Sequence, residues 1–259
     1  MSITTTISDG LAEVVMDAPP VNALTVAGWF ELADQLTAAG RDDQVACVIL
    51  RAEGRGFNAG VDIKEMQASE GFDALIGANK GCFAAFKAVY ECEVPVIAAV
   101  NGFCLGGGIG LVGNADIIVA AEDATFGLPE VKQGALGAAT HLARLVPQHR
   151  MREMVYTAEP ATAQELAGYG SVTRVVPADQ LLDAARDIAA KITRHSRTVI
   201  RAAKESLNGI DPVDVNRSYQ PDFDGVIMDG VGHFLMMEEP GEFNELLRGV
   251  VEALEPAEG

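Results

Sequence analysis

The pattern of apolar and polar positions predicts strands that alternate with helices. Apolar residues fill Val45–Leu50 and Pro95–Val100 without interruption, and Ala12–Met16 and Asp116–Ala120 are further short, mainly apolar segments. Short runs of this kind, partly β-branched, are typical of strands buried within a sheet. In Phe72–Tyr90 the apolar residues instead recur at helical spacing. Strand–helix alternation with buried strands indicates the α/β class.

Further elements extend this alternation toward the C-terminus. Thr25 can cap a helix that runs to about Ala39, and a glycine cluster leads into an apolar helix at Gly107–Val112. We expect a further strand at Val172–Val176 and helices at Ala178–Arg194 and Arg197–Leu207. A boundary near Asn208–Pro212 divides the chain into a core, residues 1–208, and a C-terminal segment, residues 209–259. In that segment we expect a strand at Gly225–Met228 and a helix near Pro240–Leu254.

Length and composition suit one large globular domain with an extension. A chain of 259 residues can bury most of its unfolded surface, and an apolar fraction of 49% argues against disorder. No apolar run reaches the roughly 18 residues of a membrane span. The N-terminal MSITTTISDG lacks the basic and apolar regions of a secretory signal. We therefore expect a cytoplasmic protein without a membrane partner.

The charge is strongly negative and unevenly distributed. The formal net charge of −18 argues against nucleic acid as a partner, because its phosphates would be repelled. From Asp211 onward there are 12 acidic and 2 basic residues, a net of −10, so residues 1–210 carry −8. An anionic cofactor or substrate must therefore meet a local group of basic side chains, which the tail is poorly suited to supply.

Cysteine and histidine support neither a disulfide framework nor a metal site. The four cysteines form no C-x-x-C pair and lie in apolar stretches, so we expect buried thiols in a reducing compartment. The four histidines are scattered along the chain. These residues are Cys47, Cys82, Cys92, Cys104, His141, His149, His195 and His233.

Two glycine-containing loops carry the candidate chemistry. They are Phe57–Glu65 (FNAGVDIKE) and Asn101–Gly110 (NGFCLGGGIG), and each follows a predicted strand and enters a helix. A helix N-terminus presents free N–H groups, and two such ends that face one point can hold an oxyanion between two backbone donors. A single glycine loop of this kind more often serves packing or helix capping. The support for an oxyanion site therefore comes from the combination of the two loops.

A dinucleotide-binding fingerprint is the competing interpretation of the second loop. Gly108-Ile109-Gly110-Leu111-Val112-Gly113 matches G-x-G-x-x-G, and Glu130 follows about 20 residues later. The fingerprint needs a tight turn directly after its strand, whereas a five-residue loop separates Val100 from the glycines. We therefore favour the oxyanion interpretation.

Several segments, taken in order, resemble the crotonase (enoyl-CoA hydratase/isomerase) superfamily. They are PPVNALT, AGVDIKEM, PVIAAVNGFCLGGGIGL and ADIIVAAEDATFGLPEVKQGALG, and the resemblance covers roughly residues 5–210. It implies a crotonase-like spiral of ββα units with a C-terminal helical segment, assembled as a homotrimer or a dimer of trimers. It also implies an acyl-CoA substrate, with coenzyme A as part of that substrate and no tightly bound cofactor.

The resemblance assigns roles to individual residues. The oxyanion donors fall on the N–H groups of Val61 and Gly107, with Gly106 beside them, and Glu130 falls on the second of two catalytic glutamates. The first glutamate is missing, because Gly110 stands at its position. Syn addition of water needs one group to orient the water and another to move the proton, so one carboxylate predicts a poor hydratase.

A second group of residues is expected around the substrate. The loop with Ala59, Asp62, Ile63 and Lys64 would border the coenzyme A moiety, and His141 is a candidate for the pocket wall. For Asp62 a structural role in its loop is the competing interpretation. For His141 the competing interpretation is a buried structural histidine whose ring nitrogens are hydrogen-bonded within the protein.

One branch of the superfamily has the greatest resemblance. FNAGVDIKEM, NRSY and Gly110 together resemble actinobacterial CoA-dependent hydrolases that open a ring late in steroid degradation. The resemblance implies that water adds to a ketone of a bicyclic dione carrying a CoA thioester. A C–C bond then breaks, the carbanion delocalises into the thioester, and Glu130 activates the water. The alternatives are an enoyl-CoA hydratase or isomerase of broad range, and a non-catalytic acyl-CoA-binding protein.

The tail departs from this family. Pro221–Leu247 resembles the last strand, histidine loop and final helix of α/β-hydrolases. The sequence contains no G-x-S-x-G nucleophile motif for His233 to serve, so we do not expect His233 to be catalytic.

Overall fold

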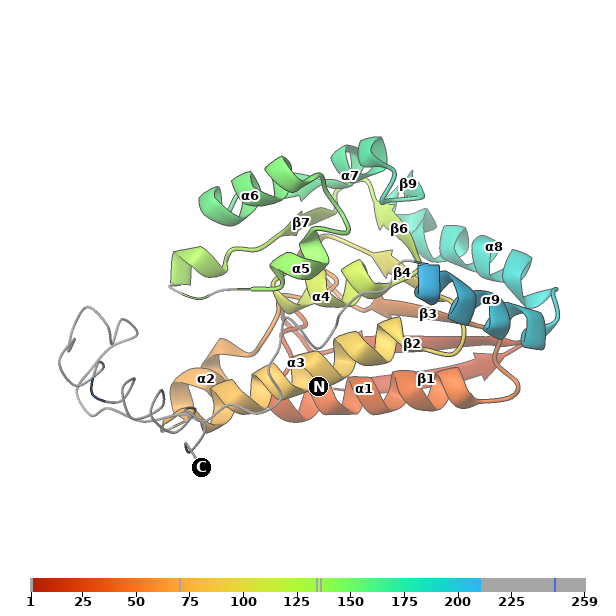
Figure 1. The fold of residues 1–259 in the computed structure, drawn as a ribbon, viewed down its shortest axis with the longest axis horizontal. Coiled ribbons are helices and arrows are strands. Elements are labelled where there is room, and N and C mark those ends of the chain that lie inside the picture. The colour runs from red at the N-terminus through yellow and green to blue at the C-terminus, as the bar shows by residue number, and fades with distance from the viewer. Residues whose placement is uncertain (1, 70, 134, 136, 211–244, 246–259) are drawn as a thin grey trace, which may run out of the picture. The chain divides into compact units, whose positions relative to one another are not determined.

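The computed structural model describes residues 2–210, except 70, 134 and 136, together with residue 245 (Figure 1). The chain separates into two units, Met1–Phe223 and Asp224–Gly259, and the fold described below is that of the first. The expected strand Gly225–Met228, the expected helix near Pro240–Leu254 and His233 lie outside the described residues. The division into 1–208 and 209–259 therefore stays a prediction.

A six-stranded sheet has the order β1-β2-β3-β4-β6-β9. The edge strand β1 is antiparallel to β2, and all later neighbours are parallel. β4 is buried along its whole length and β3 over its first four residues, as their continuous apolar runs predicted. The strands are β1 (Ser2–Ser8), β2 (Leu11–Asp17), β3 (Cys47–Ala52), β4 (Val96–Val100), β6 (Ile117–Ala121) and β9 (Arg174–Val176).

A smaller sheet turns the chain into a spiral. After β4 the chain adds β5 (Phe103–Leu105) to this sheet and enters α4 (Gly107–Asn114). After β6 it adds β7 (Thr125–Gly127), parallel to β5, and enters the 3₁₀ helix η1 (Glu130–Gln133). After β3 it makes one parallel bridge, Asn58 to Cys104, before α2 (Ile63–Ala68). This repeat is the predicted spiral of ββα units, and it brings the starts of successive helices together.

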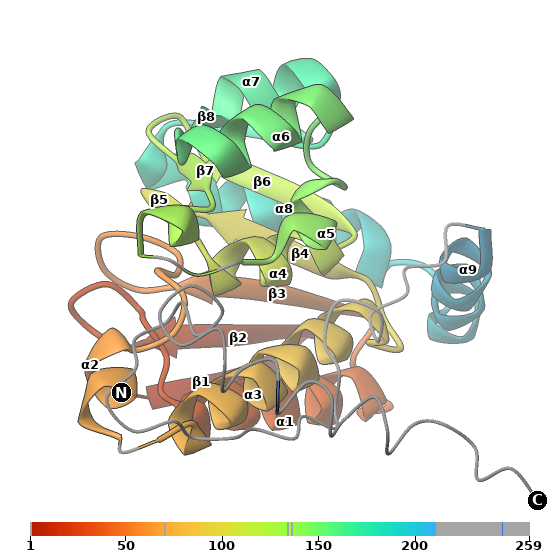
Figure 2. The same cartoon turned by 60° about the vertical axis from the view of Figure 1, so that its left-hand side comes forward.

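Helices cover both faces of the large sheet. Thr25 caps α1 (Val26–Arg41) as predicted, because its Oγ1 accepts a hydrogen bond from the Gly28 N–H at 3.2 Å. α1 packs on β1, β2 and β3, and α3 (Asp73–Tyr90) packs on α1. α8 (Leu181–Thr193) contacts β2, β3, β4, β6 and β9, and Figure 2 shows α1 and α3 in front of the sheet and α8 behind it.

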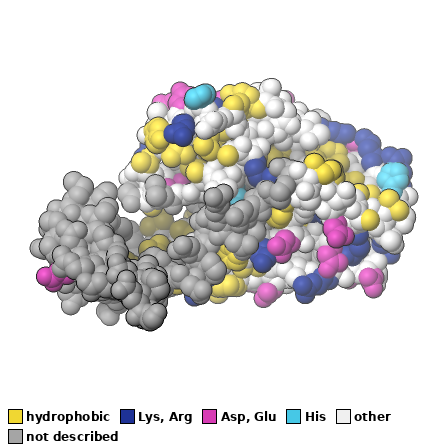
Figure 3. All heavy atoms as spheres, in the orientation of Figure 1, with side chains coloured by type: hydrophobic (Ala, Val, Ile, Leu, Met, Phe, Trp, Pro, Cys, Tyr) yellow, Lys and Arg dark blue, Asp and Glu magenta, His cyan; other side chains and the backbone are white. Residues whose placement is uncertain are grey.

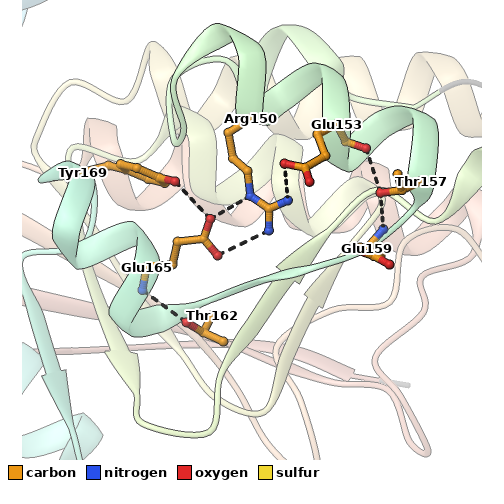
Figure 4. A network of polar contacts seen from close by, with 7 residues as sticks. All are labelled: Arg150, Glu153, Thr157, Glu159, Thr162, Glu165 and Tyr169. Carbon is orange, nitrogen blue, oxygen red and sulfur yellow. Dashed lines mark hydrogen bonds and ion pairs between the residues drawn. The ribbon is translucent and has the colours of Figure 1, made fainter.

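Three helices that the apolar pattern did not predict follow η1. They are α5 (Ala139–Leu142), α6 (Gln148–Thr157) and α7 (Ala163–Tyr169), the last of which begins after β8 (Ala161–Thr162). Ion pairs join α6 to α7, and Figure 4 shows Arg150 between two glutamates. Arg150 donates to Glu165 at 2.7 and 3.3 Å and to Glu153 at 3.0 Å, and the Tyr169 hydroxyl donates to Glu165 at 3.0 Å. α6 is mainly polar, and Met154 is its one buried residue, so few apolar positions mark this helix in the sequence.

The last described helix is α9 (Arg197–Ile210). Figure 3 shows lysine and arginine side chains gathered over α8 and α9. Several of these cations already have acidic partners: Arg186 pairs with Glu13, Lys191 with Asp187 and Arg201 with Glu93. No helix in the described part of the chain has the length and apolarity needed to cross a membrane.

Candidate active site

A cavity of about 280 Å³ lies where α2, α3, α4 and η1 meet. Six of the residues predicted for the site line it: Ala59, Val61, Ile63, Gly106, Gly107 and Glu130. Ten other described lining residues were not predicted, and half of these come from α3, whose helical pattern was evident but whose role was not. The unpredicted lining residues used in the argument below are Gly60, Cys82, Phe86 and Gly137. The others are Leu75, Ala78, Asn79, Pro129, Ala135 and Ala138.

Backbone hydrogen bonds hold the two glycine loops against each other. The Phe57 N–H donates to the Phe103 carbonyl at 2.8 Å, and the Leu105 N–H donates to the Asn58 carbonyl at 2.8 Å. The buried Asn58 side chain accepts from the Gly60 N–H at 2.8 Å and donates to the Asn22 carbonyl at 2.6 Å. The backbone that leads to Val61 is thus fixed from both sides.

The two predicted oxyanion donors lie where Gly60 packs against the start of α4. Gly60 has φ +89°, and a Cβ placed on it would lie 3.2 Å from the Gly107 amide nitrogen. Only glycine therefore fits without strain or displacement. Gly107 is the first residue of α4, and Val61 follows Gly60 directly. Within the described residues, neither the Val61 nor the Gly107 N–H donates to a protein acceptor.

Glu130 presents a carboxylate beside this pair. A Cβ on Gly106 would lie 3.0 Å from Glu130 Oε1, and one on Gly137 would lie 2.3 Å from the same oxygen. Burial raises the pKa of Glu130, since desolvation disfavours the charged form. Its Oε2 is buried and has no hydrogen-bond partner among the described residues. No other carboxylate belongs to the described lining of the cavity.

An aromatic ring occupies the position where the family pattern has its first glutamate. A Cβ placed on Gly110 would lie 2.1 Å from Phe86 Cζ, far inside van der Waals contact. A side chain at position 110 would therefore require the Phe86 ring to move. The glycine at this position was visible in the sequence, but the residue that excludes a side chain there was not.

Cys82 adds a thiol to the cavity wall. All four cysteines are buried and free of disulfides, as the sequence predicted. Burial, followed by the charge of Glu130, raises the pKa of the Cys82 thiol well above its ordinary value. The thiol therefore stays protonated at neutral pH and is a poor nucleophile. Among the described residues, no three His, Cys, Asp or Glu side chains gather as a metal site requires.

Three residues predicted for the substrate region do not line the cavity. Asp62 caps α2, because its Oδ1 accepts from the Lys64 N–H at 2.9 Å, and Lys64 is exposed. His141 is fully buried, with Nδ1 2.9 Å from Asn114 Nδ2. Burial and the nearby Arg144 lower the pKa of His141 to about 4, so it is neutral at physiological pH. The geometry of His141 corresponds to the structural interpretation raised from the sequence.

A pair of backbone donors beside one buried carboxylate, on a spiral of ββα units, defines an enzyme of the crotonase type. The family model for enoyl-CoA hydratase/isomerase matches residues 6–217, and the chain belongs to this family. Two relatives that are each 66% identical to the chain carry the name (7aS)-7a-methyl-1,5-dioxo-2,3,5,6,7,7a-hexahydro-1H-indene-carboxyl-CoA hydrolase. The one from Rhodococcus jostii (strain RHA1) aligns over 85% of this chain and 86% of its own length. For the one from Mycobacterium tuberculosis the shares are 85% and 90%.

More distant relatives share the fold. Carnitinyl-CoA dehydratase of Salmonella enteritidis is 34% identical over 84% of both chains. The crystal structure of human enoyl Coenzyme A hydratase domain-containing protein 3 has a TM-score of 0.77 at 30% identity, covering 83% of this chain and 87% of its own. Enoyl-CoA hydratase from Bacillus anthracis has a TM-score of 0.77 at 31% identity, with coverage of 84% and 86%. These likenesses confirm the predicted α/β crotonase-like fold.

Proposed function

We propose that this enzyme hydrolyses a C–C bond in a ring of a bicyclic dione that carries a CoA thioester. The observation that carries the proposal is Glu130, the one carboxylate in the described lining of the cavity, with Phe86 packed where a second one would stand. The name of the 66% identical relatives describes the same substrate class, two fused rings with two ketones and a CoA ester. Fused rings with a methyl group at their junction are what the last two rings of a steroid leave, so steroid degradation is the proposed pathway.

The cavity residues divide the chemistry between them. Glu130 removes a proton from water, and the water oxygen bonds to a ring ketone carbon. The bond from that carbon to its ring neighbour then breaks, which leaves a carboxylic acid on one side and an electron pair on the other. The pair delocalises into the thioester carbonyl, and the N–H groups of Val61 and Gly107 stabilise the resulting oxyanion. Glu130 returns the proton to carbon, so the product is the substrate plus one water.

Glu130 is suited to both proton transfers of this reaction, removal of a proton from water and its return to carbon. Its raised pKa makes it a stronger base than a solvated carboxylate once it is ionised. The carboxylic acid formed in this way can return the proton, because the carbanion is much more basic than a carboxylate. The thioester is not cleaved, and no redox step or metal is needed for the balance. The chemistry itself therefore supports the expectation that the enzyme has no tightly bound cofactor.

Two assays with the purified chain test the proposal. With the bicyclic dione-CoA we expect a product heavier by one water, formed without release of free CoA thiol. With crotonyl-CoA we expect little hydration, because addition of water across a double bond uses two positioned groups. Rapid hydration of crotonyl-CoA with no turnover of the dione would favour a broad hydratase. Saturable binding of both thioesters without any turnover would favour a non-catalytic binding protein.

Assembly and location are parts of the same proposal. We propose a homotrimer or a dimer of trimers in the cytoplasm, as the family resemblance implies. Sedimentation analysis of the full chain would give the mass of the assembly directly. A monomer at micromolar concentration would contradict this part and leave the proposed chemistry standing.

A further inference from the structure

Three glycines of helix α4 pack against Trp29, Phe86 and His141. Gly107, Gly110 and Gly113 are three residues apart, so they share one face of the helix. A Cβ on Gly107 would lie 2.7 Å from the Trp29 ring, and one on Gly110 would lie 2.1 Å from the Phe86 ring. A Cβ on Gly113 would lie 2.5 Å from the His141 carbonyl oxygen and 2.9 Å from its Cβ. Gly110 and Gly113 also belong to the dinucleotide-binding fingerprint, and a Cβ on its remaining glycine, Gly108, would lie 2.9 Å from the Asn58 carbonyl oxygen. Packing therefore explains all three glycines of that pattern.

The three side chains also hold one another. The ring centroids of Trp29 and Phe86 are 5.8 Å apart at an interplanar angle of 88°, and those of Phe86 and His141 are 5.1 Å apart at 72°. Both are edge-to-face arrangements, which favour aromatic pairs beyond simple burial. Phe86 is only 1% exposed and lies in the middle of the row. Its ring is therefore held in one place by a neighbour on each side and by the bare backbone of Gly110.

Phe86 and Glu130 contact the same helix start about one turn apart. Glu130 lies against Gly106 and Phe86 against Gly110, a separation of roughly 6 Å along the helix axis. Both line the cavity. The cavity thus has a hydrogen-bonding wall at Glu130 and a rigid apolar wall at Phe86. A water molecule can be positioned by the first and finds no partner at the second.

We propose that Phe86 is a specificity-determining residue that favours ring opening over addition of water to a double bond. This inference rests on the proposed function. Addition needs a second polar group to orient water or to shuttle the proton, and the Phe86 ring fills that position with apolar surface. The same surface packs against the fused rings of the acyl group, while Glu130 delivers the one water that the reaction consumes.

Three variants test this role through one ratio, kcat/KM for the dione-CoA divided by kcat/KM for crotonyl-CoA. Phe86→Leu keeps an apolar side chain of similar volume but loses the flat wall, and should lower the ratio about 10-fold. Phe86→Ala with Gly110→Glu opens the space and adds the second carboxylate, and should lower the ratio about 100-fold or more, with measurable hydration of crotonyl-CoA. Phe83→Leu is the matched control, because Phe83 lies on α3 but outside the cavity. It should leave the ratio unchanged.

The outcomes separate this inference from the proposed function. If wild type opens the dione ring and Phe86→Leu keeps the ratio within about twofold of the Phe83→Leu control, the role of Phe86 is overturned and the function stands. If wild type hydrates crotonyl-CoA and leaves the dione unchanged, both are overturned. Phe86→Leu alone is decisive when the double variant fails to fold, since a small change of shape in the core is well tolerated.

Discussion

At the scale of single residues, the proposed chemistry depends on one carboxylate in a cavity whose described lining is otherwise nearly apolar. The family pattern in the sequence pointed to Glu130, and the fold surrounds its carboxylate with the backbone of Gly106 and Gly137. Because those neighbours are glycines, they bring the backbone close to the carboxylate and add no side chain that could satisfy it. Burial then raises the pKa of the carboxyl group, which is a property of the fold and not of the residue type.

Glu130→Gln should lower kcat by about 10²–10⁴, because the amide has nearly the same shape but cannot accept the proton of water. Affinity for CoA, measured by calorimetry, should stay close to wild type, because the change leaves the rest of the cavity unaltered. Glu205→Gln is the control, since Glu205 is exposed on α9. Wild-type turnover in Glu130→Gln would remove Glu130 from the mechanism.

The pH dependence of kcat/KM should reflect the ionisation of Glu130. The base must be ionised, and its pKa lies above the ordinary value of 4.5. Activity should therefore rise with pH through a midpoint above 4.5, and the acid limb should reflect Glu130. An acid limb at or below the ordinary carboxyl value in the wild-type enzyme would contradict a desolvated base.

Stability should depend on Glu130 in the opposite direction to activity. The folded protein holds the Glu130 proton more tightly than the unfolded chain, whose value is near 4.5. Stability is therefore lost as pH rises from 4.5 through the folded pKa, because the buried group must ionise. Glu130→Gln should then melt at a higher temperature than wild type at neutral pH, and the difference should shrink toward pH 4.5. Equal melting temperatures across this range would mean that Glu130 is well solvated.

At the scale of elements, the decisive feature is the start of α4. Its glycines match both an oxyanion loop and a dinucleotide-binding fingerprint in the sequence. The side chains that pack on them from α1, α3 and α5 explain why glycine is needed at these positions. The same neighbours complicate substitutions. Gly106 has φ +57° and lies against Glu130, so Gly106→Ala disturbs the site directly. Any side chain at Gly107, proline included, meets the Trp29 ring.

Replacing the amide of Gly107 by an ester tests the donor without adding an atom. The N–H is outside the hydrogen-bond ladder of α4, because the first residues of a helix have no partner within it. We expect kcat to fall about 10²–10³, or about 3–4 kcal/mol, with little change in melting temperature. An ester at Val112, inside α4, is the control and should lower the melting temperature while sparing kcat. Full turnover of the Gly107 ester would exclude its N–H as an oxyanion donor.

At the scale of the whole described fold, one buried ion pair joins elements far apart in sequence. Lys204 of α9 donates to both carboxylate oxygens of Asp116 at 2.7 Å, and Asp116 also accepts from the Val96 N–H at 2.8 Å. The Lys204 side chain is 3% exposed and lies over the Tyr90 ring. This pair fixes α9 to β4 and to the start of β6, away from the cavity.

Lys204→Met should destabilise the fold, because it leaves the Asp116 carboxylate without its cation. Loss of one partner of a buried pair costs about 3 kcal/mol or more, which corresponds to a fall of roughly 6–12 °C in melting temperature for a domain of this size. Turnover at 25 °C should be unaffected. Adding Asp116→Asn should restore part of the stability, because the unpaired charge is then gone. A melting temperature unchanged in Lys204→Met would show that the pair contributes nothing.

The sequence by itself determined the features that depend on near neighbours. Continuous apolar runs identified β3 and β4, helical periodicity identified α3, and the hydroxyl of Thr25 identified the start of α1. The spacing of apolar residues and helix capping each depend on residues that are close together in the chain, so a short stretch of sequence is enough to predict them. Family resemblance added Val61, Gly107 and Glu130, which the fold brings to one cavity.

Only the tertiary structure decided what depends on contacts between distant residues. β1 is a threonine-rich edge strand, and β5, β7 and β8 have two or three residues each, too few to show a period. The bridge from Asn58 to Cys104 and the contact of Phe86 with Gly110 join segments whose local patterns carry no sign of each other. The same holds for His141, which the sequence allowed in the pocket and the fold buried behind Phe86. Side-chain packing chooses such partners through shape in three dimensions, and a linear pattern of apolar and polar positions does not encode that shape.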